Sequence, residues 1–338
     1  MVDDDKLCYL VNGINYRIID KKNRKVEVAF SNSPLVQKKL YAGKIKIPGF
    51  ISIDGKEYSV TEIGEKAFCY SMELTSVSIP NTLVSIGARA FWGCHRLNTI
   101  DLSASVERID PDALSFCLNL KNIEVEDGNR FFSSHEGILY NAAKTAVLYC
   151  PKGKTTAVII PTTTKRIEER SFLGCAIDSV CIPDTVTSIG NEAFSHCKNL
   201  TSLYIPNSVT AIGKGAFMHS ALKSVRLPEH ITYIDNYTFH GCKLESVNIP
   251  NSVKSIGVDA FSNCMSLHSL SIPCSVTAIG QRAFMGCNQK SLIIPKSVKS
   301  IGRQAFCWYS IGAQIKRCPF PDSPIPKNGS CRLCLKNE

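Results

Sequence analysis

The sequence predicts an α/β repeat solenoid with a parallel β-sheet face, short helical turns and β-hairpin caps. Three observations lead to this fold class. A ten-residue phrase recurs almost unchanged, for example SVTAIGKGAF at 208–217 and SVTAIGQRAF at 275–284. The phenylalanine that ends the phrase returns every 22 or 23 residues, except across one gap of 58 residues. A unit of this size cannot bury its own apolar edge, so neighbouring units are expected to stack.

Each copy follows the pattern L-x-x-V-x-I-P-x-S-V-x-x-I-G-x-x-A-F-x-x-C. In LTSLYIP (200–206), polar and apolar residues alternate, as in a strand with one buried face. The side chains expected to face inward are those of Leu200, Leu203 and Ile205. Pro206 is expected to end the strand, because proline has no N–H to donate to a neighbouring strand.

The second half of each copy forms another inward-facing arm and a turn. Val209 and Ile212 supply the apolar side chains of this arm, and Gly213 permits a turn that a side chain would obstruct. Ala216 and Phe217 are expected to pack together on a short helical turn. Ten copies carry this marker position, which holds Phe68, Phe91, Leu114, Phe172, Phe194, Phe217, Phe239, Phe261, Phe284 and Phe306.

Segments that break the period define the domain boundaries. Residues 1–43 are predicted to form an N-terminal β-hairpin cap, and residues 44–312 a solenoid of about ten turns. A β-hairpin insertion is expected near 128–156, because the apolar stretches of GILYNAAKTAVLYCPKGK flank 141–144. Residues 313–338 form a tail that contains several prolines and cysteines. Caps of this kind would cover the open ends of the stack.

Composition excludes several classes of protein. The chain is 44% hydrophobic and 20% charged, which is typical of a folded protein, and no apolar run is long enough to span a membrane. The net charge of +10 is concentrated in residues 1–50 and 290–338, rather than along one stripe, so nucleic-acid binding is not expected. The acidic N-terminus does not resemble a signal peptide; either the protein stays inside the cell or a leader has been removed.

Seven of the 16 cysteines occupy one repeat position, three residues after the marker. They are Cys94, Cys117, Cys175, Cys197, Cys242, Cys264 and Cys287. Ser71 and Ser220 fill the same position in other copies, so we interpret it as a column of small buried groups with free thiols. The tail cysteines Cys307, Cys318, Cys331 and Cys334 leave three alternatives open: free thiols, a disulfide or a zinc site.

No motif of catalysis or of cofactor binding occurs in the chain. The histidines His95, His196, His219 and His240 follow the marker by one to four residues, in a position expected to face solvent. Every polar residue lies at a position that is repeated in other copies, whereas an active site needs a set of residues that occurs only once. We therefore expect no enzyme activity, no metal and no cofactor.

The outward positions of the predicted sheet are the candidate binding surface. The third position of the strand segment is nearly always small and polar, whereas the fifth position varies. Tyrosine and arginine are favoured at binding hot spots, so Tyr204 and Arg226 on adjacent turns are the strongest candidates. The other candidates on this face are Cys181, Asn248, Ser271 and Ile293.

The phrase IPNSVTAIGKGAF and its sister AFSHCKNLTSLYIP (193–206) resemble the BspA-like leucine-rich repeat family, as do the GILY segment at 137–140 and the Tyr58–Gly64 entry. The resemblance implies a non-enzymatic surface or secreted protein of bacteria or protists that binds host matrix, other cells or glycans. We therefore expect an adhesin-like binding module that is monomeric and not inserted in a membrane. The alternative is an intracellular protein-interaction scaffold of the same fold.

Overall fold

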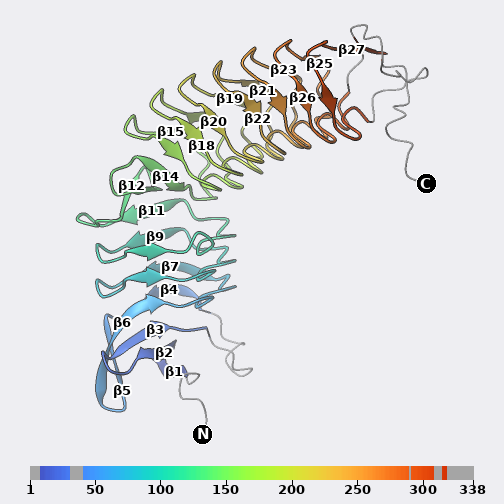
Figure 1. Cartoon of the computed structure of the whole chain (residues 1–338). Helices are drawn as coiled ribbons and strands as arrows, with labels where there is room; N and C mark the ends of the chain where they lie inside the picture. The colour runs from blue at the N-terminus through green and yellow to red at the C-terminus, as the bar shows by residue number, and fades with distance from the viewer. Residues whose placement is uncertain (1–7, 31–40, 289–290, 308–313, 318–338) are drawn as a thin grey trace, which may run out of the picture. The chain divides into compact units, whose positions relative to one another are not determined.

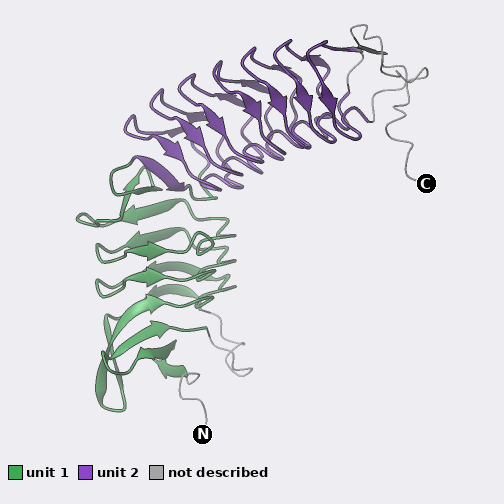
Figure 2. Cartoon of the chain, in the orientation of Figure 1, with its two compact units in different colours: residues 1–144, 150–154 green, residues 145–149, 155–338 purple. Residues whose placement is uncertain are grey.

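The computed structural model describes residues 8–30, 41–288, 291–307 and 314–317, and every regular element in these ranges is a β-strand (Figure 1). The chain divides into two compact units, unit 1 (residues 1–144 and 150–154) and unit 2 (residues 145–149 and 155–338) (Figure 2). Within the described ranges, no helix has the length and apolar character that crossing a membrane requires.

Unit 1 contains two sheets and a hairpin. The larger sheet has the order β1-β2-β3-β6-β8-β10, with β5 paired to β6. Its strands are β1 (Cys8–Val11), β2 (Ile14–Asp20), β3 (Lys25–Val28), β5 (Phe50–Ile53), β6 (Lys56–Ile63), β8 (Ser85–Ile86) and β10 (Arg108–Ile109). The second sheet is parallel and consists of β4 (Gly43–Lys46), β7 (Leu74–Ser78), β9 (Thr99–Leu102) and β11 (Asn122–Val125). The hairpin joins β12 (Phe132–His135) to β13 (Ile138–Asn141).

Unit 2 continues the two-strand repeat. One set of parallel strands comes from the LxxVxIP segments: β15 (Val158–Ile159), β17 (Val180–Cys181), β19 (Ser202–Tyr204), β21 (Ser224–Arg226), β23 (Ser246–Asn248), β25 (Ser269–Ser271) and β27 (Ser291–Ile294). The other set begins with β14 (Ala146–Tyr149) from the insertion and continues with the second arms: β16 (Arg166–Ile167), β18 (Ser188–Ile189), β20 (Ala211–Ile212), β22 (Tyr233–Ile234), β24 (Ser255–Ile256), β26 (Ala278–Ile279) and β28 (Ser300–Ile301). Each turn of the chain therefore adds one strand to each set.

The predicted strand pattern is confirmed in the turn that carries β19. Leu203 and Ile205 are buried, whereas Ser202 and Tyr204 are exposed. The strand ends before Pro206, whose carbonyl accepts a hydrogen bond from the backbone N–H of Val209 in a tight turn. The core of each turn thus lies between its two strands and the segment that carries the marker phenylalanine.

The prediction of short helical turns, and with it the α/β class, is wrong: the described part of the chain is a β-solenoid without helices. In the segment around Phe194, Glu192 and His196 have φ values of 52° and 59°. A left-handed residue on each side of the phenylalanine interrupts an α-helix, in which successive residues share negative φ. The backbone N–H of Phe194 donates to the carbonyl of Ala216 in the next turn, while the N–H of Cys197 donates back to the Phe194 carbonyl.

The marker phenylalanines form stacked columns inside the solenoid. In unit 2 the rings from Phe172 to Phe306 stack in sequence with centroid distances of 4.7–5.7 Å. In unit 1, Phe68 and Phe91 stack at 5.2 Å, and Leu114 continues their position. The repeat period thus places one large apolar side chain above another, which anchors every turn to its neighbour.

The predicted column of buried free thiols is confirmed for its seven members. Most of these thiols donate to the carbonyl of the phenylalanine in the preceding turn; Cys242 Sγ, for example, lies 2.9 Å from the Phe217 oxygen. Burial raises the pKa of Cys117, Cys242 and Cys287 to about 12. These thiols therefore remain protonated and act as small core groups.

The inserted region has neighbouring strands on both sides of residues 141–144, because β13 lies between β12 and β14 in one sheet. Inside the inserted region, β12 and β13 form a hairpin whose turn residues Glu136 and Gly137 both have positive φ, as a type I′ turn requires. β29 (Gln314–Arg317) falls in the predicted tail and pairs in parallel with β27. Cys307 is disulfide-bonded. The other three tail cysteines, Cys318, Cys331 and Cys334, lie outside the described residues.

Candidate functional site

The register of the parallel strands aligns the variable fifth positions in rows. In unit 2, Tyr204 pairs with Arg226, Arg226 with Asn248, and Asn248 with Ser271. Because residues in register on parallel strands point to the same side, these four side chains form one row. All four are exposed, as the alternating pattern predicts.

The two strongest candidates contact each other. The Arg226 guanidinium carbon lies 5.9 Å from the centroid of the Tyr204 ring, within the range of a cation–π contact. The Tyr204 side chain is still 53% exposed. The pair therefore offers a planar aromatic surface and a charged group side by side, without a role in the core.

Apolar residues occupy other fifth positions of the same set of strands. Ile159 pairs with Cys181, and their side chains are exposed. Ile293 on β27 is exposed as well. Single exposed isoleucines are common on protein surfaces, so these two side chains do not by themselves mark a binding site. The sequence-predicted residues thus lie on one set of strands but in three separate sheets: Cys181 in the first, the row from Tyr204 to Ser271 in the second and Ile293 in the third.

The equivalent row of unit 1 has a different character. Lys46, Ser78, Asp101 and Glu124 are in register and exposed. Sequence reasoning did not single out this row, because none of its members is aromatic or arginine. It provides charges but no large contact surface.

The histidines are placed differently from the prediction that they face solvent. His196 is exposed, but His219 and His240 are half-buried, and the ring centroids of successive members lie 5.0 and 4.9 Å apart. Burial lowers the pKa of both His219 and His240, and Lys198 lowers that of His219 further. The position is semi-buried because the turns stack closely enough for each ring to cover the next.

Sequence reasoning missed an aromatic ladder at the corresponding turns of unit 1. The rings of Tyr70 and Trp92 lie 4.7 Å apart, and those of Trp92 and Phe116 lie 5.0 Å apart. Lys152 Nζ lies 4.9 Å from the centre of the Phe116 ring. The signal in the sequence is an aromatic residue one or two positions after the marker, but nothing in the pattern shows that the three rings touch.

The described residues contain no cluster of three or more histidine, cysteine or acidic side chains that could hold a metal ion. The site with the clearest geometry is therefore an exposed sheet face with a polar and aromatic row. The fold and this face define a repeat solenoid of the leucine-rich type.

The family follows from comparison with known sequences. The model of the BspA type leucine-rich repeat region, in six copies, matches residues 51–144, 142–265 and 232–323. The chain belongs to this family. A search of curated proteins found no significant match.

One solved structure shows the same fold, and two others align with lower TM-scores. A leucine-rich repeat protein from Eubacterium ventriosum is 22% identical with a TM-score of 0.64, and the alignment covers 90% of this chain and 95% of that one. The pneumococcal vaccine antigen PcpA is 18% identical with a TM-score of 0.48, covering 91% and 98% of the two chains. A leucine-rich cell surface protein from Faecalibacterium prausnitzii is 21% identical with a TM-score of 0.40, covering 90% and 95%.

Proposed function

We propose that the protein is a non-enzymatic binding module that recognises a protein or glycan through the exposed sheet face of unit 2. The observation that carries this proposal is the row Tyr204–Arg226–Asn248–Ser271, in which an aromatic ring and a guanidinium group touch on adjacent strands. Parallel strands hold the backbone at fixed spacing, so little backbone conformational entropy is lost when a partner binds.

The composition of the row fits recognition of a polar surface. Arg226 can donate to carboxylates or carbonyls, Tyr204 offers ring and hydroxyl, and Asn248 both donates and accepts. The third-position serines on either side are small, so a partner can approach the larger side chains closely. A folded protein or a glycan presents groups of this kind.

The family resemblance supports a location at the cell surface or outside the cell, with host matrix or other cells as the target. The buried free thiols favour the alternative, an intracellular scaffold, because free cysteines persist in reducing compartments. Fractionation of the source cells, followed by protease treatment of intact cells, separates the two: a surface protein is cleaved without lysis, and a scaffold is not.

A binding screen against matrix proteins and glycans, followed by mutation, tests the site. We expect the double variant Tyr204→Ala with Arg226→Ala to keep its fold, because neither side chain fills the core. It should weaken binding of the partner found by more than about 1 kcal/mol, as hot-spot residues do. The measurement is titration calorimetry or surface plasmon resonance.

The matched control is Lys214→Ala with Gln281→Ala, on the turn surface of the same unit. This pair should bind as the unchanged protein does. If the control pair loses binding and the Tyr204/Arg226 pair retains it, the sheet face is not the binding surface.

A further inference from the structure

Unit 1 carries a second surface, separate from the sheet face, where the regular stacking of strands stops. β10 is the last strand of its sheet and pairs only with β8. β12 is likewise the terminal strand of its own sheet and pairs only with β13. Among the described residues, each of these strands therefore has one edge that is not paired with another strand in a sheet.

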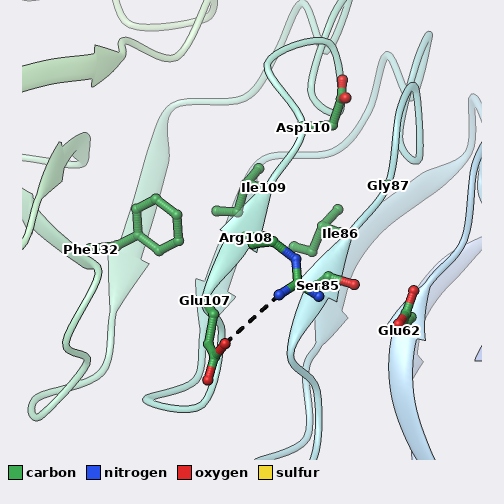
Figure 3. A pocket seen from close by; sticks show the side chains of 9 residues that line it. All are labelled: Glu62, Ser85, Ile86, Gly87, Glu107, Arg108, Ile109, Asp110 and Phe132. Carbon is green, nitrogen blue, oxygen red and sulfur yellow. Dashed lines mark ion pairs between the residues drawn. The ribbon is translucent and has the colours of Figure 1, made fainter. Parts of the chain in front are cut away.

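A hollow of about 590 Å³ lies at these two edges (Figure 3). Its apolar lining includes Ile86 on β8, Ile109 on β10 and Phe132 on β12, and Figure 3 shows the side chains of Ile109 and Phe132 pointing toward one another. Its volume falls in the range of small-ligand pockets, but it is open to solvent along the edge of the sheet. The hollow is an open recess rather than an enclosed cavity.

The burial of the isoleucine column shows that a neighbour is missing at this place. Ile63, Ile86 and Ile109 occupy equivalent positions on β6, β8 and β10. Ile63 and Ile86 are 0% and 2% exposed, whereas Ile109 is only half-buried. A further strand beside β10 would cover Ile109 in the way that β10 covers Ile86.

Hydrogen bonds of Asn129 fix the side of the hollow formed by β12 relative to β10. Asn129 Nδ2 donates to the carbonyls of Ser103 and Val106, at 3.0 and 2.9 Å, in the turn that leads into β10. Asn129 Oδ1 accepts from the backbone N–H groups of Phe131 and Phe132, both at 2.8 Å. One side chain thus ties the start of β12 to the approach of β10, so the hollow exists before any partner arrives.

The charges around the hollow indicate which partner fits. Three carboxylates, those of Glu62, Glu107 and Asp110, line it together with a single cation, Arg108. The Arg108 guanidinium pairs with Glu107 at 3.8 Å (Figure 3). The lining therefore carries a net negative charge beside an apolar floor.

We propose that this hollow binds an extended peptide segment of a partner protein, which adds as a strand to the edge of β10 and carries alternating apolar and basic side chains. The backbone of the segment pairs with β10, and an apolar side chain enters between Ile109 and Phe132. Basic side chains then meet Glu107 and Asp110, which precede and follow β10 and line the hollow. Such strand addition combines main-chain hydrogen bonds with pockets for alternate side chains.

A synthetic peptide tests this proposal on the full chain. The probe is fluorescein-labelled Lys-Val-Lys-Val-Lys-Val, with two comparison peptides: Glu-Val-Glu-Val-Glu-Val, and the lysine peptide N-methylated at alternate residues so that one edge cannot donate hydrogen bonds. We expect the lysine peptide to bind in fluorescence anisotropy, and both comparison peptides to bind at least tenfold more weakly.

Two variants with matched controls locate the binding. Phe132→Ala and Glu107→Lys should each reduce affinity for the lysine peptide at least fivefold. Phe131→Ala removes the neighbouring exposed ring and Glu57→Lys reverses an exposed charge on β6; neither residue lines the hollow, so both controls should bind normally. Circular dichroism and denaturation of all four variants confirm that they fold.

Several results would overturn the proposal. They are an absence of binding by the lysine peptide at millimolar concentration, equal binding of the glutamate or N-methylated peptide, and unchanged binding by both Phe132→Ala and Glu107→Lys. Self-association of the chain that Phe132→Ala abolishes would assign the edge to a second copy instead of a peptide, and would equally reject it.

Discussion

The cysteine that follows the marker phenylalanine by three residues links two turns through one carbonyl. The Phe239 oxygen, for example, accepts the backbone N–H of Cys242 in its own turn and the thiol of Cys264 in the next, at 3.1 Å each. Serine occupies the position twice, and the hydroxyl of Ser71 is buried with no partner among the described residues. A thiol loses less free energy than a hydroxyl when it is buried, which explains why cysteine predominates.

The seven thiols of this column should resist modification in the folded protein. Burial raises their pKa, most clearly for Cys94, Cys117, Cys242, Cys264 and Cys287, so little thiolate is present at pH 8. Under native, non-reducing conditions a maleimide reagent should label the exposed Cys8, Cys181 and Cys274 and leave the column unmodified. Mass spectrometry of the labelled peptides is the measurement.

Unfolding in guanidinium chloride before labelling provides the comparison, because all seven thiols should then react. Finding the column cysteines in disulfides would contradict the structure. Rapid labelling of the column in the native protein would show that the turns open far more readily than their packing implies.

At the scale of the element, the segment around the marker phenylalanine is held by hydrogen bonds of tight turns and not by those of a helix. Along residues 192–197, backbone N–H groups donate alternately to the next turn and within their own turn. The N–H groups of Glu192, Phe194 and His196 donate to the carbonyls of Lys214, Ala216 and Met218 in the next turn. The N–H groups between them donate to carbonyls of their own turn, as that of Ala193 does to Gly190. The segment is thus a ladder of tight turns that add to one another like strands. Close stacking also requires Gly213, whose hypothetical Cβ would lie 2.6 Å from the backbone nitrogen of Asn191.

The phenylalanine stack should contribute strongly to the stability of this element. Phe239 is fully buried, and its ring lies 5.3 Å from that of Phe217 and 5.2 Å from that of Phe261. We expect Phe239→Ala to reduce the free energy of unfolding by about 3–5 kcal/mol, because it leaves a cavity between two stacked rings. Chemical denaturation measures the loss, with the exposed Tyr233→Ala as a control that should cost less than about 1 kcal/mol. A similarly small loss at Phe239 would be incompatible with the stack.

At the scale of the whole molecule, the repeat made the strands of the LxxVxIP segments and the buried columns predictable, because the spacing of apolar residues indicates which side chains face inward. The second arms were expected to face inward, but not to pair as a second set of strands such as β18 and β20. The helical turns were not predictable in the same way: Ala216 and Phe217 favour no conformation strongly, and only the left-handed backbone at Gly215 and His219 excludes a helix. The outward direction of Tyr204 followed from alternation, but its contact with Arg226 depends on register. The hollow beside β10 depends on where a sheet ends, which a repeat pattern does not encode.

The stability of the molecule should fall as the pH decreases from 7 to 5. Burial lowers the pKa of His219 and His240 below the value of about 6.5 expected in the unfolded chain. The unfolded state therefore takes up protons first, so the stabilisation is complete above about pH 6.5 and is lost as the pH falls toward the folded-state pKa values. Lys198 and Arg282 oppose protonation as well, whereas Asp259 favours it at His240.

The double variant His219→Gln with His240→Gln isolates this effect, because glutamine keeps a polar side chain but does not titrate. Urea denaturation at pH 7.0, 6.0 and 5.0 should show a steady loss of stability for the unchanged protein and a smaller loss for the variant. His268→Gln, which replaces an exposed histidine outside the stack, should behave like the unchanged protein. Identical pH dependence in all three proteins would show that the two stacked imidazoles do not control stability in acid. A gain in stability as the pH falls would mean that the folded state binds these protons more tightly than the unfolded chain, the reverse of what burial of His219 and His240 implies.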